Sequence, residues 1–142
     1  MKIQIINGPN LNLLGTREPS IYGTTSFEDF MKELMSRFAD VDLNYFQSNL
    51  EGDLVTRIQE CRGKVDGIVL NAGGYTHTSV AIHDAIPAAG VPVVEVHISN
   101  IYAREDFRHK SLITSKCLGM ISGLGVEGYA LAIQFLKNHV GK

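Results

Sequence analysis

Arg17 and Tyr22 lie close together in a long stretch without regular periodicity, and the pair could carry out proton transfer. A free tyrosine has a pKa of about 10, which is too high for a base near neutral pH. A guanidinium nearby favours the phenolate, and exclusion of water by a closing loop would strengthen that effect. Gly15 and Gly23 bracket the pair and could act as hinges. We therefore expect a mobile lid at about residues 15–23 that carries a base, with a solvated arginine and a packing tyrosine as the structural alternative.

Glu95 and His97 form a second candidate pair. Two residues apart on a predicted strand, their side chains point to the same face of the sheet. A carboxylate beside an imidazole fixes its tautomer and favours the imidazolium, which suits a general acid. A histidine with purely structural hydrogen bonds is the alternative. The position of the pair at the carboxyl end of a strand favours a functional role.

Further polar side chains follow the third predicted strand and the fourth. Asn71 and His77 flank a glycine turn whose backbone could approach a ligand closely, although a simple turn would need the same glycines. Arg108 could bind an anionic or hydroxylated substrate, or it could lie on the surface. Asp84 falls within a predicted helix, where a solvated carboxylate is the ordinary case. We expect structural roles for four other side chains: Arg104, His83, His109 and His139.

No motif for a metal or cofactor accompanies these residues. A G-x-x-x-x-G-K-[ST] phosphate loop is missing from the sequence, and Cys61 and Cys117 have no metal-ligand spacing. The lysines lie at strand starts, on helices or near the terminus, away from any position expected of a desolvated Schiff-base amine. We therefore expect a site that works without a metal or cofactor.

The composition limits the class of protein. A chain of 142 residues fits one domain, which we expect to span residues 1–142, and 44% hydrophobic with 20% charged residues is ordinary for a globular protein. The formal net charge of -2 argues against a nucleic-acid binder. No apolar run approaches the ~20 residues that span a bilayer. Because neither a signal-peptide pattern nor a disulfide framework is present, we expect a cytoplasmic protein.

Apolar patterns predict strands that alternate with helices. The expected strands cover residues 3–6, 41–46, 67–70, 92–96 and 117–122. The expected helices cover residues 27–38, with Met35 in the core-facing stripe, then 51–62, about 79–89 with Thr78 or Ser79 as cap, and 126–139. This alternation predicts an α/β, flavodoxin-like fold with a five-stranded, parallel, doubly wound sheet flanked by helices. Ligands bind at the carboxyl ends of such strands, so the polar clusters after all five strands are expected to form one site.

Motifs in a specific order extend over essentially the whole chain. They lie at residues 7–15 (Asn-Gly-Pro-Asn-Leu-Asn-Leu-Leu-Gly), 17–19, 22–23, 47–49, 51–52, 71–73, 75–79, 95–100, 104–108, 123–125 and 128–129. In these motifs the sequence resembles the type II 3-dehydroquinate dehydratases. Departures are minor: Gly74 stands where the family more often has alanine, Leu50 where histidine is frequent, and His83 where arginine is common.

The resemblance implies loss of water from 3-dehydroquinate by anti elimination through an enolate, giving 3-dehydroshikimate. Tyr22 would remove the proton alpha to the ketone, and Arg17 would hold it as tyrosinate and stabilise the transition state. His97 would protonate the departing hydroxyl, oriented by Glu95. Asn10 would help to position a water that stabilises the enolate oxygen. The implied substrate-binding residues are Asn71, His77, Asp84, Ile98, Ser99 and Arg108.

The same resemblance implies a cofactor-free homododecamer, a tetramer of trimers, in which Asp84 reaches the site of a neighbouring subunit. It implies a role in the shikimate pathway of aromatic amino acid biosynthesis, with quinate catabolism as the alternative pathway. Two other functions on the same fold stay open. A flavin- or nucleotide-binding module is disfavoured by the missing phosphate loop, and a non-catalytic scaffold is disfavoured by the complete set of site residues.

Overall fold

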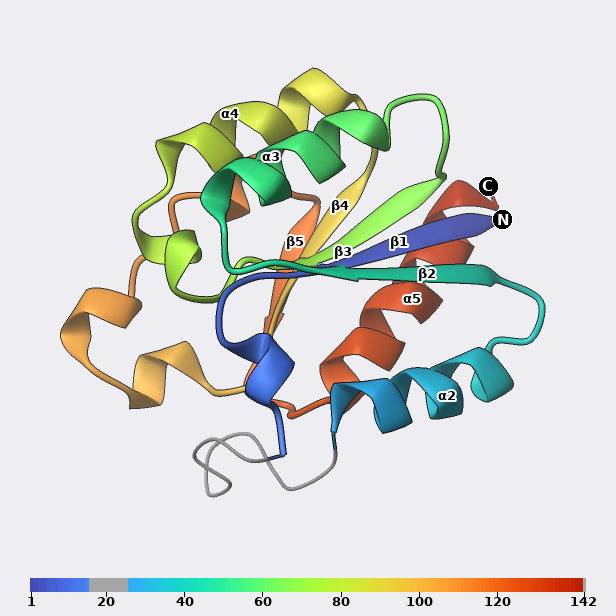
Figure 1. The fold of residues 1–142 in the computed structure, drawn as a ribbon, viewed down its shortest axis with the longest axis horizontal. Coiled ribbons are helices and arrows are strands. Elements are labelled where there is room, and N and C mark those ends of the chain that lie inside the picture. Colours follow the sequence, from blue (N-terminus) through green and yellow to red (C-terminus); the bar gives the residue numbers. More distant parts are fainter. Residues whose placement is uncertain (16–25, 142) are drawn as a thin grey trace.

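The computed structural model describes residues 1–15 and 26–141, which form a five-stranded sheet between two layers of helices (Figure 1). The strands are β1 (Lys2–Asn7), β2 (Asp42–Gln47), β3 (Gly67–Asn71), β4 (Val93–His97) and β5 (Gly119–Ser122). They lie in the order β2-β1-β3-β4-β5, and all neighbouring strands are parallel. This order is that of a flavodoxin-like doubly wound sheet, so the predicted fold class is confirmed.

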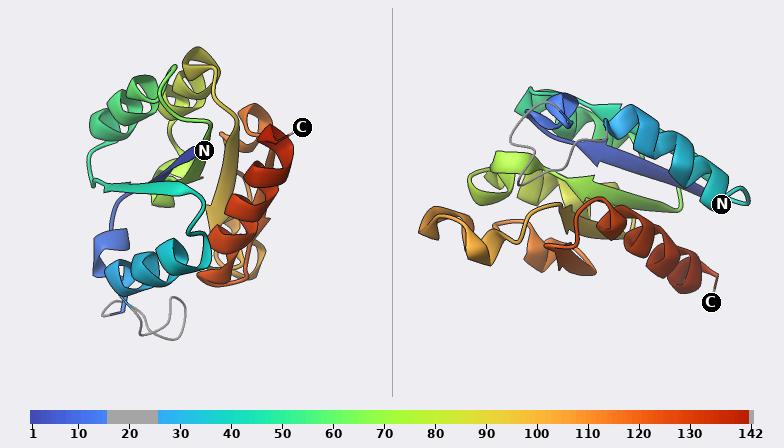
Figure 2. Two further views of the ribbon diagram at one scale, coloured as in Figure 1. Left: turned by 90° about the vertical axis from the view of Figure 1, so that its right-hand side faces the viewer. Right: turned by 90° about the horizontal axis from the view of Figure 1, so that it is seen from below.

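The α-helices of the described residues cover both faces of the sheet. They are α2 (Phe27–Arg37), α3 (Glu51–Glu60), α4 (Val80–Ala89) and α5 (Glu127–Val140). Figures 1 and 2 show α2 and α5 on one face and α3 and α4 on the other. Of the two predicted caps for α4, Ser79 rather than Thr78 is the N-cap, because its Oγ accepts from the Ile82 N–H (2.9 Å). None of these helices is long and apolar enough to span a membrane.

Successive side chains of the central strands β1 and β3 enter two separate cores. Ile5 of β1 packs with the residues of α2 and α5, whereas the next residue, Ile6, packs with those of α3 and α4. The predicted core stripe of α2 is confirmed for the buried residues Phe27, Phe30, Met31 and Leu34. It is wrong for Met35, which is 47% exposed because it lies beyond the edge of the helix face that contacts the sheet.

The described residues include five short 3-10 helices, of which one follows β1, one follows β3 and three lie between β4 and β5. They are η1 (Leu11–Leu13), η2 (Gly73–His77), η3 (Ile101–Ala103), η4 (Asp106–Arg108) and η5 (Thr114–Lys116). Periodicity does not detect them, because each is shorter than two helical turns. The residues of η1, η3 and η4 lie at one end of the molecule, while the start of β1 and the end of α5 lie at the other (Figure 2).

The loops after β1 and β3 cross at very short range. A Cβ on Gly8 would lie 2.4 Å from the carbonyl oxygen of Ala72, and one on Gly73 would lie 3.1 Å from the carbonyl oxygen of Pro9. The Gly8 N–H donates to the Asn71 carbonyl oxygen (2.7 Å). Gly8 therefore has no room for a side chain. Because glycine lacks a Cβ, the ends of β1 and β3 can approach each other this closely.

We predict that Gly8→Ala lowers the free energy of unfolding by about 1–3 kcal/mol, since backbone must shift to accept the new methyl group. The matched control is Gly52→Ala on α3, where a Cβ would meet no atom within 4 Å. That substitution should stabilise the helix by about 0.5–1 kcal/mol. Urea denaturation of both variants measures the two effects, and equal stability of Gly8→Ala and the wild type would contradict the close crossing.

Candidate functional site

A cavity of about 90 Å³ opens at the carboxyl ends of β1, β3 and β4 in the described part of the chain. Its walls come from the loops that follow these strands and from the segment that contains η3 and η4. The predicted site residues that line it are Asn10, Asn71, His77, His97, Ile98, Ser99 and Arg108. The structure thus brings together side chains from positions far apart in the sequence.

Two other predicted site residues that the structure describes, Glu95 and Asp84, do not line this cavity. Glu95 lies behind His97 and is fully buried. Asp84 lies on an exposed side of α4, where its carboxylate contacts Nδ1 of His83 (2.8 Å) and its side chain is 70% exposed. Arg17 and Tyr22, with the predicted lid, lie outside the described residues.

The polar clusters after β2 and β5 do not line the cavity either. The clusters after β1, β3 and β4 line the cavity, whereas those after β2 and β5 lie beside it at the same edge of the sheet, where Asn49 contacts Asn10. The physical reason is the strand order, since β2 and β5 are the edge strands of the sheet. Their ends lie farther from the centre, where the cavity forms.

The cluster after β2 supports the cavity from behind. Gln47 Nε2 donates to the Gly8 carbonyl (3.1 Å) and to Asn49 Oδ1 (3.1 Å). Asn49 Oδ1 also accepts from the Asn10 N–H (3.0 Å). Asn10 has φ 69°, a left-handed backbone that asparagine tolerates better than most residues. This amide network holds the start of η1 against the sheet.

A buried hydrogen-bond chain fixes the orientation of Asn71. Its Nδ2 donates to the hydroxyl of Tyr129 (2.9 Å), which in turn donates to Asn7 Oδ1 (2.8 Å). Asn71 Oδ1 accepts from the Gly73 N–H (3.1 Å). Tyr129 is fully buried, and burial raises the pKa of its phenol, so it stays a neutral hydroxyl. The amide of Asn71 therefore meets the cavity in one defined orientation.

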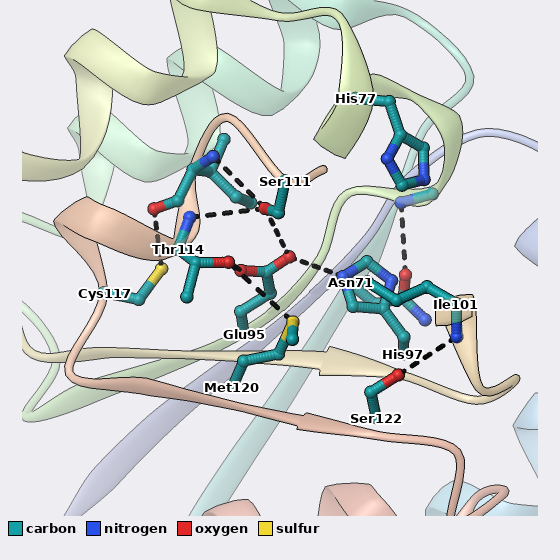
Figure 3. A network of polar contacts seen from close by, with 12 residues as sticks. Asn71, His77, Glu95, His97, Ile101, Ser111, Thr114, Cys117, Met120 and Ser122 are labelled. Atoms are coloured by element: carbon teal, nitrogen blue, oxygen red, sulfur yellow. Dashed lines mark hydrogen bonds and ion pairs between the residues drawn. The ribbon is translucent and has the colours of Figure 1, made fainter. Parts of the chain in front are cut away.

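Glu95 and His97 are in direct contact, as their spacing on the strand predicts (Figure 3). Nε2 of His97 lies 2.5 Å from Oε2 of Glu95, and the His97 side chain is 6% exposed. The carboxylate also accepts from Ser111 Oγ (2.9 Å) and from Thr114 Oγ1. Because Nε2 is bound to the carboxylate, Nδ1 is the ring nitrogen left for a ligand.

Opposing effects set the pKa of Glu95. Burial raises the pKa of the carboxyl, whereas the hydrogen bond and charge of His97, followed by the hydrogen bonds of Thr114 and Ser111, lower it. The net pKa lies below the ordinary value, so the carboxylate is ionised at neutral pH. An ionised carboxylate at this place accepts the N–H of His97 and fixes the orientation of its ring.

His77 faces the same cavity from η2. Its Nδ1 donates to the Lys110 carbonyl (2.8 Å), and its ring lies 6.4 Å from that of His97 between centroids, with a 24° angle between the planes. Burial lowers the pKa of His77, the bond to Lys110 opposes that effect, and the charges of His97 and Arg108 lower it further. His77 is thus a neutral imidazole with Nε2 as an acceptor near neutral pH.

Two arginines complete the wall. Arg108 lies over the Phe107 ring (5.1 Å from CZ to the centroid), and its Nε donates to Glu105 Oε2 (2.5 Å). Arg104 also lines the cavity, and its Nη1 donates to Ser99 Oγ (3.3 Å). Arg104, for which we expected a structural role, thus lies at the cavity. A run of charged residues gives no signal for which arginine turns inward.

The lining combines two imidazoles, two guanidinium groups and two amides, and it includes no carboxylate side chain among the described residues. Such a wall suits a small anion with several hydroxyl groups, and His97 with Glu95 can supply a proton to it. Within residues 1–15 and 26–141, no three His, Cys, Asp or Glu side chains are grouped to hold a metal ion.

Three polar residues behind the cavity have no site role in the sequence analysis: Tyr129, Ser111 and Thr114. A buried tyrosine needs a partner for its hydroxyl, so Tyr129 on the apolar side of a predicted helix was a usable signal. Ser111 and Thr114 carry no comparable signal, because they contact Glu95 of β4 from positions 16 and 19 residues further along the chain.

The departures from the family pattern lie outside the polar contacts of the cavity. A Cβ on Gly74 would meet no atom within 4 Å, so an alanine would fit there equally well. Leu50 is 64% exposed just before α3. His83 contacts Asp84 on the exposed side of α4. None of them contacts the Glu95–His97 pair.

Known proteins resemble this chain along nearly its whole length. The family model for dehydroquinase class II matches residues 1–137. The 3-dehydroquinate dehydratase of Fusobacterium nucleatum is 54% identical over 147 residues, which span 100% of both chains. The type II dehydroquinase from Butyrivibrio crossotus has a TM-score of 0.91 and 44% identity over 96% of this chain and 97% of its own. The type II dehydroquinase from Propionibacterium acnes has a TM-score of 0.92 and 40% identity over 96% of each chain.

We predict a pH-dependent stability difference between the wild type and Glu95→Gln. A carboxyl whose pKa is lowered on folding stabilises the folded chain above its unfolded pKa, about 4.3, and loses that contribution as the pH falls. The neutral amide cannot titrate, so Glu95→Gln should be less stable by about 2 kcal/mol near pH 7. The difference should shrink below pH ~4.3.

Urea denaturation between acidic and neutral pH measures this difference. Glu28→Gln, which neutralises an exposed glutamate of α2, is the matched control and should change stability little. A deficit of Glu95→Gln that stays constant across the pH range would contradict an ionised, stabilising Glu95.

Proposed function

The chain belongs to the class II dehydroquinase family, and we propose that it catalyses the dehydration of 3-dehydroquinate to 3-dehydroshikimate as a hydro-lyase (EC 4.2.1.10). The observation that carries the proposal is the Glu95–His97 pair at a cavity that Asn71, His77 and Arg108 also line. The named relatives are similar along their full length, so the whole catalytic unit is comparable.

The chemistry of the cavity wall supports this substrate. 3-Dehydroquinate is a small ring with a carboxylate, a ketone and several hydroxyl groups. In the proposed complex, Asn71, His77 and Arg108 bind the ring hydroxyls through an amide, a neutral imidazole and a guanidinium. Ile98 and Ser99 hold the carboxylate, partly through the backbone at the end of β4.

The proposed reaction is an anti elimination with an enolate intermediate. Tyr22, held as tyrosinate by Arg17, accepts the proton alpha to the ketone, and the electron pair moves toward the ketone oxygen. Asn10 positions a water that stabilises the resulting enolate. The enolate then expels the hydroxyl, and His97 donates the proton that makes it a water molecule. Glu95 keeps His97 oriented for this proton transfer.

We also propose that residues 1–142 form a single domain with a mobile lid at about residues 15–23. Residues 15–23 close over the bound substrate and deliver Arg17 and Tyr22 to it, which excludes water and favours the phenolate. The proposed chemistry uses tyrosine, arginine, histidine and an ordered water, so it requires no metal or cofactor.

We propose that the enzyme works in the cytoplasm, in the shikimate pathway that leads to aromatic amino acids, with quinate catabolism as the alternative. The proposed assembly is a homododecamer, a tetramer of trimers. Asp84, which lies apart from the cavity of its own chain and is 70% exposed, binds substrate in the site of a neighbouring subunit. Its exposure on α4 makes it available for such a contact.

Activity is tested by following 3-dehydroshikimate through its conjugated-enone absorbance. We expect the wild type to be active and Tyr22→Phe and Arg17→Ala to lose nearly all turnover while remaining folded. His97→Ala should lower kcat by about 10²–10⁴-fold, as expected for a missing general acid. His139→Ala, at an exposed position of α5, is the matched control and should keep wild-type activity.

Each contrary outcome has a defined meaning. Near-wild-type turnover of Tyr22→Phe or Arg17→Ala would remove residues 15–23 from the mechanism. A raised KM with unchanged kcat in His97→Ala would reassign this histidine to binding. An inactive protein that purifies with bound flavin or nucleotide would favour the binding-module alternative.

A second prediction tests the proposed contribution of Asp84 across subunits. Asp84→Asn and His97→Ala should each be poorly active as pure oligomers. When the two chains are co-expressed, mixed oligomers should regain activity, because some sites then combine a wild-type Asp84 with a wild-type His97. Mixtures no more active than their parents would contradict the sharing of sites, and sedimentation velocity measures the oligomeric state directly.

A further inference from the structure

Residues 110–114 contact His77 directly and the Glu95 partner of His97, although none of these five residues lines the cavity. The Lys110 carbonyl accepts the Nδ1–H of His77 (2.8 Å). Two residues later, the Leu112 N–H donates to the carbonyl of Thr76 (2.8 Å), so this segment is tied to η2. The same segment also reaches the second histidine, through Glu95.

Both oxygens of the Glu95 carboxylate are occupied (Figure 3). Oε1 accepts from Thr114 Oγ1, and Oε2 accepts from Ser111 Oγ (2.9 Å) and from His97 Nε2 (2.5 Å). The Glu95 side chain is fully buried, so water does not compete for these positions. The carboxylate therefore cannot rotate without breaking a hydrogen bond on each oxygen.

The turn that carries the two hydroxyls is itself closed by hydrogen bonds. Ser111 Oγ accepts from the backbone N–H groups of Ile113 and Thr114 (3.3 Å each). The Ile113 side chain between them is fully buried in the core beside α3 and α4. This anchoring places the two hydroxyls at a fixed spacing opposite the two carboxylate oxygens.

We propose that Ser111 and Thr114 are positioning residues for the acid step of the reaction. They hold the Glu95 carboxylate so that it accepts the Nε2–H of His97 and leaves Nδ1 toward the cavity. This inference rests on the proposed function, because the acid role of His97 belongs to it. The contacts themselves are independent of that function and can be tested separately.

The ionisable groups around Glu95 indicate how its pKa should change when a hydroxyl donor is removed. His97 contacts it on β4, and the charges of Glu95 and Arg108 both act on His77 of η2. Burial and the charge of Glu95 raise the pKa of the Cys117 thiol to about 12, so that thiol stays neutral. When a hydroxyl donor is removed, burial is less opposed and the pKa of Glu95 rises. Protonation of the carboxylate, which ends its pairing with His97, then occurs at higher pH.

Thr114→Val is the most selective variant, because it removes the hydroxyl with little change of shape. We expect kcat to fall about tenfold at neutral pH, the effect of losing one hydrogen bond to a buried charge, with little change in KM. The acid limb of the kcat profile should move to higher pH. Thr114→Ser keeps a hydroxyl at this position. It should retain most of the activity, and the acid limb of its kcat profile should lie at the wild-type pH. Thr56→Val, on an exposed side of α3, is the matched control.

A readout independent of activity is the NMR titration of the His97 ring. The acid-side change of its ring signals should move to higher pH in Thr114→Val, and it should stay in place in Thr114→Ser and Thr56→Val. Ser111→Ala should move it in the same direction, which keeps the test available if Thr114→Val does not fold.

These readouts separate the two proposals. An inactive wild type would remove the proposed function, while the ring titration would still measure whether the hydroxyls control the Glu95–His97 pair. An active wild type whose pH profile and ring titration are unchanged by Thr114→Val and Ser111→Ala would overturn the positioning role.

Discussion

A fully buried carboxylate at the end of a central strand constrains the site and the fold together. Removing the Glu95 charge from water costs several kcal/mol unless hydrogen bonds replace the lost hydration. Three donors do so, from His97 on β4, from Ser111, and from Thr114 at η5. Because these donors come from separate segments, the segment after η4 must fold back against the sheet for the charge to be tolerated.

The sheet order explains where the remaining site residues lie. The ends of the inner strands β1, β3 and β4 form the cavity, and the edge strand β2 contributes amides that support it. The crossing of Gly8 and Ala72 brings the loops of β1 and β3 together, and Tyr129 orients the amide of Asn71 from α5. Asn71, His77 and His97 are thus oriented by residues that do not line the cavity.

Much of the fold could be predicted because its signals are local. A period of two along β4 puts Glu95 and His97 on one face, and periodic apolar residues with Ser79 as cap define α4. The same periodicity wrongly predicts that Met35 is buried, because its exposure depends on the width of the contact between α2 and the sheet. The position of Arg104 at the cavity was not predictable, because the sequence of a charged segment does not show which side chain turns inward.

The sequence by itself determined the strands, the α-helices and the pairing of Glu95 with His97, since each follows from spacing within one segment. The alternation of strands and helices along the chain predicted the parallel sheet. Only the tertiary structure decided that β2 and β5 stay outside the cavity wall, that Arg104 enters it, and that Ser111 and Thr114 complete the shell of Glu95. The physical reason is that these contacts join groups distant in sequence. Their geometry depends on how the layers pack, and no local pattern encodes that packing.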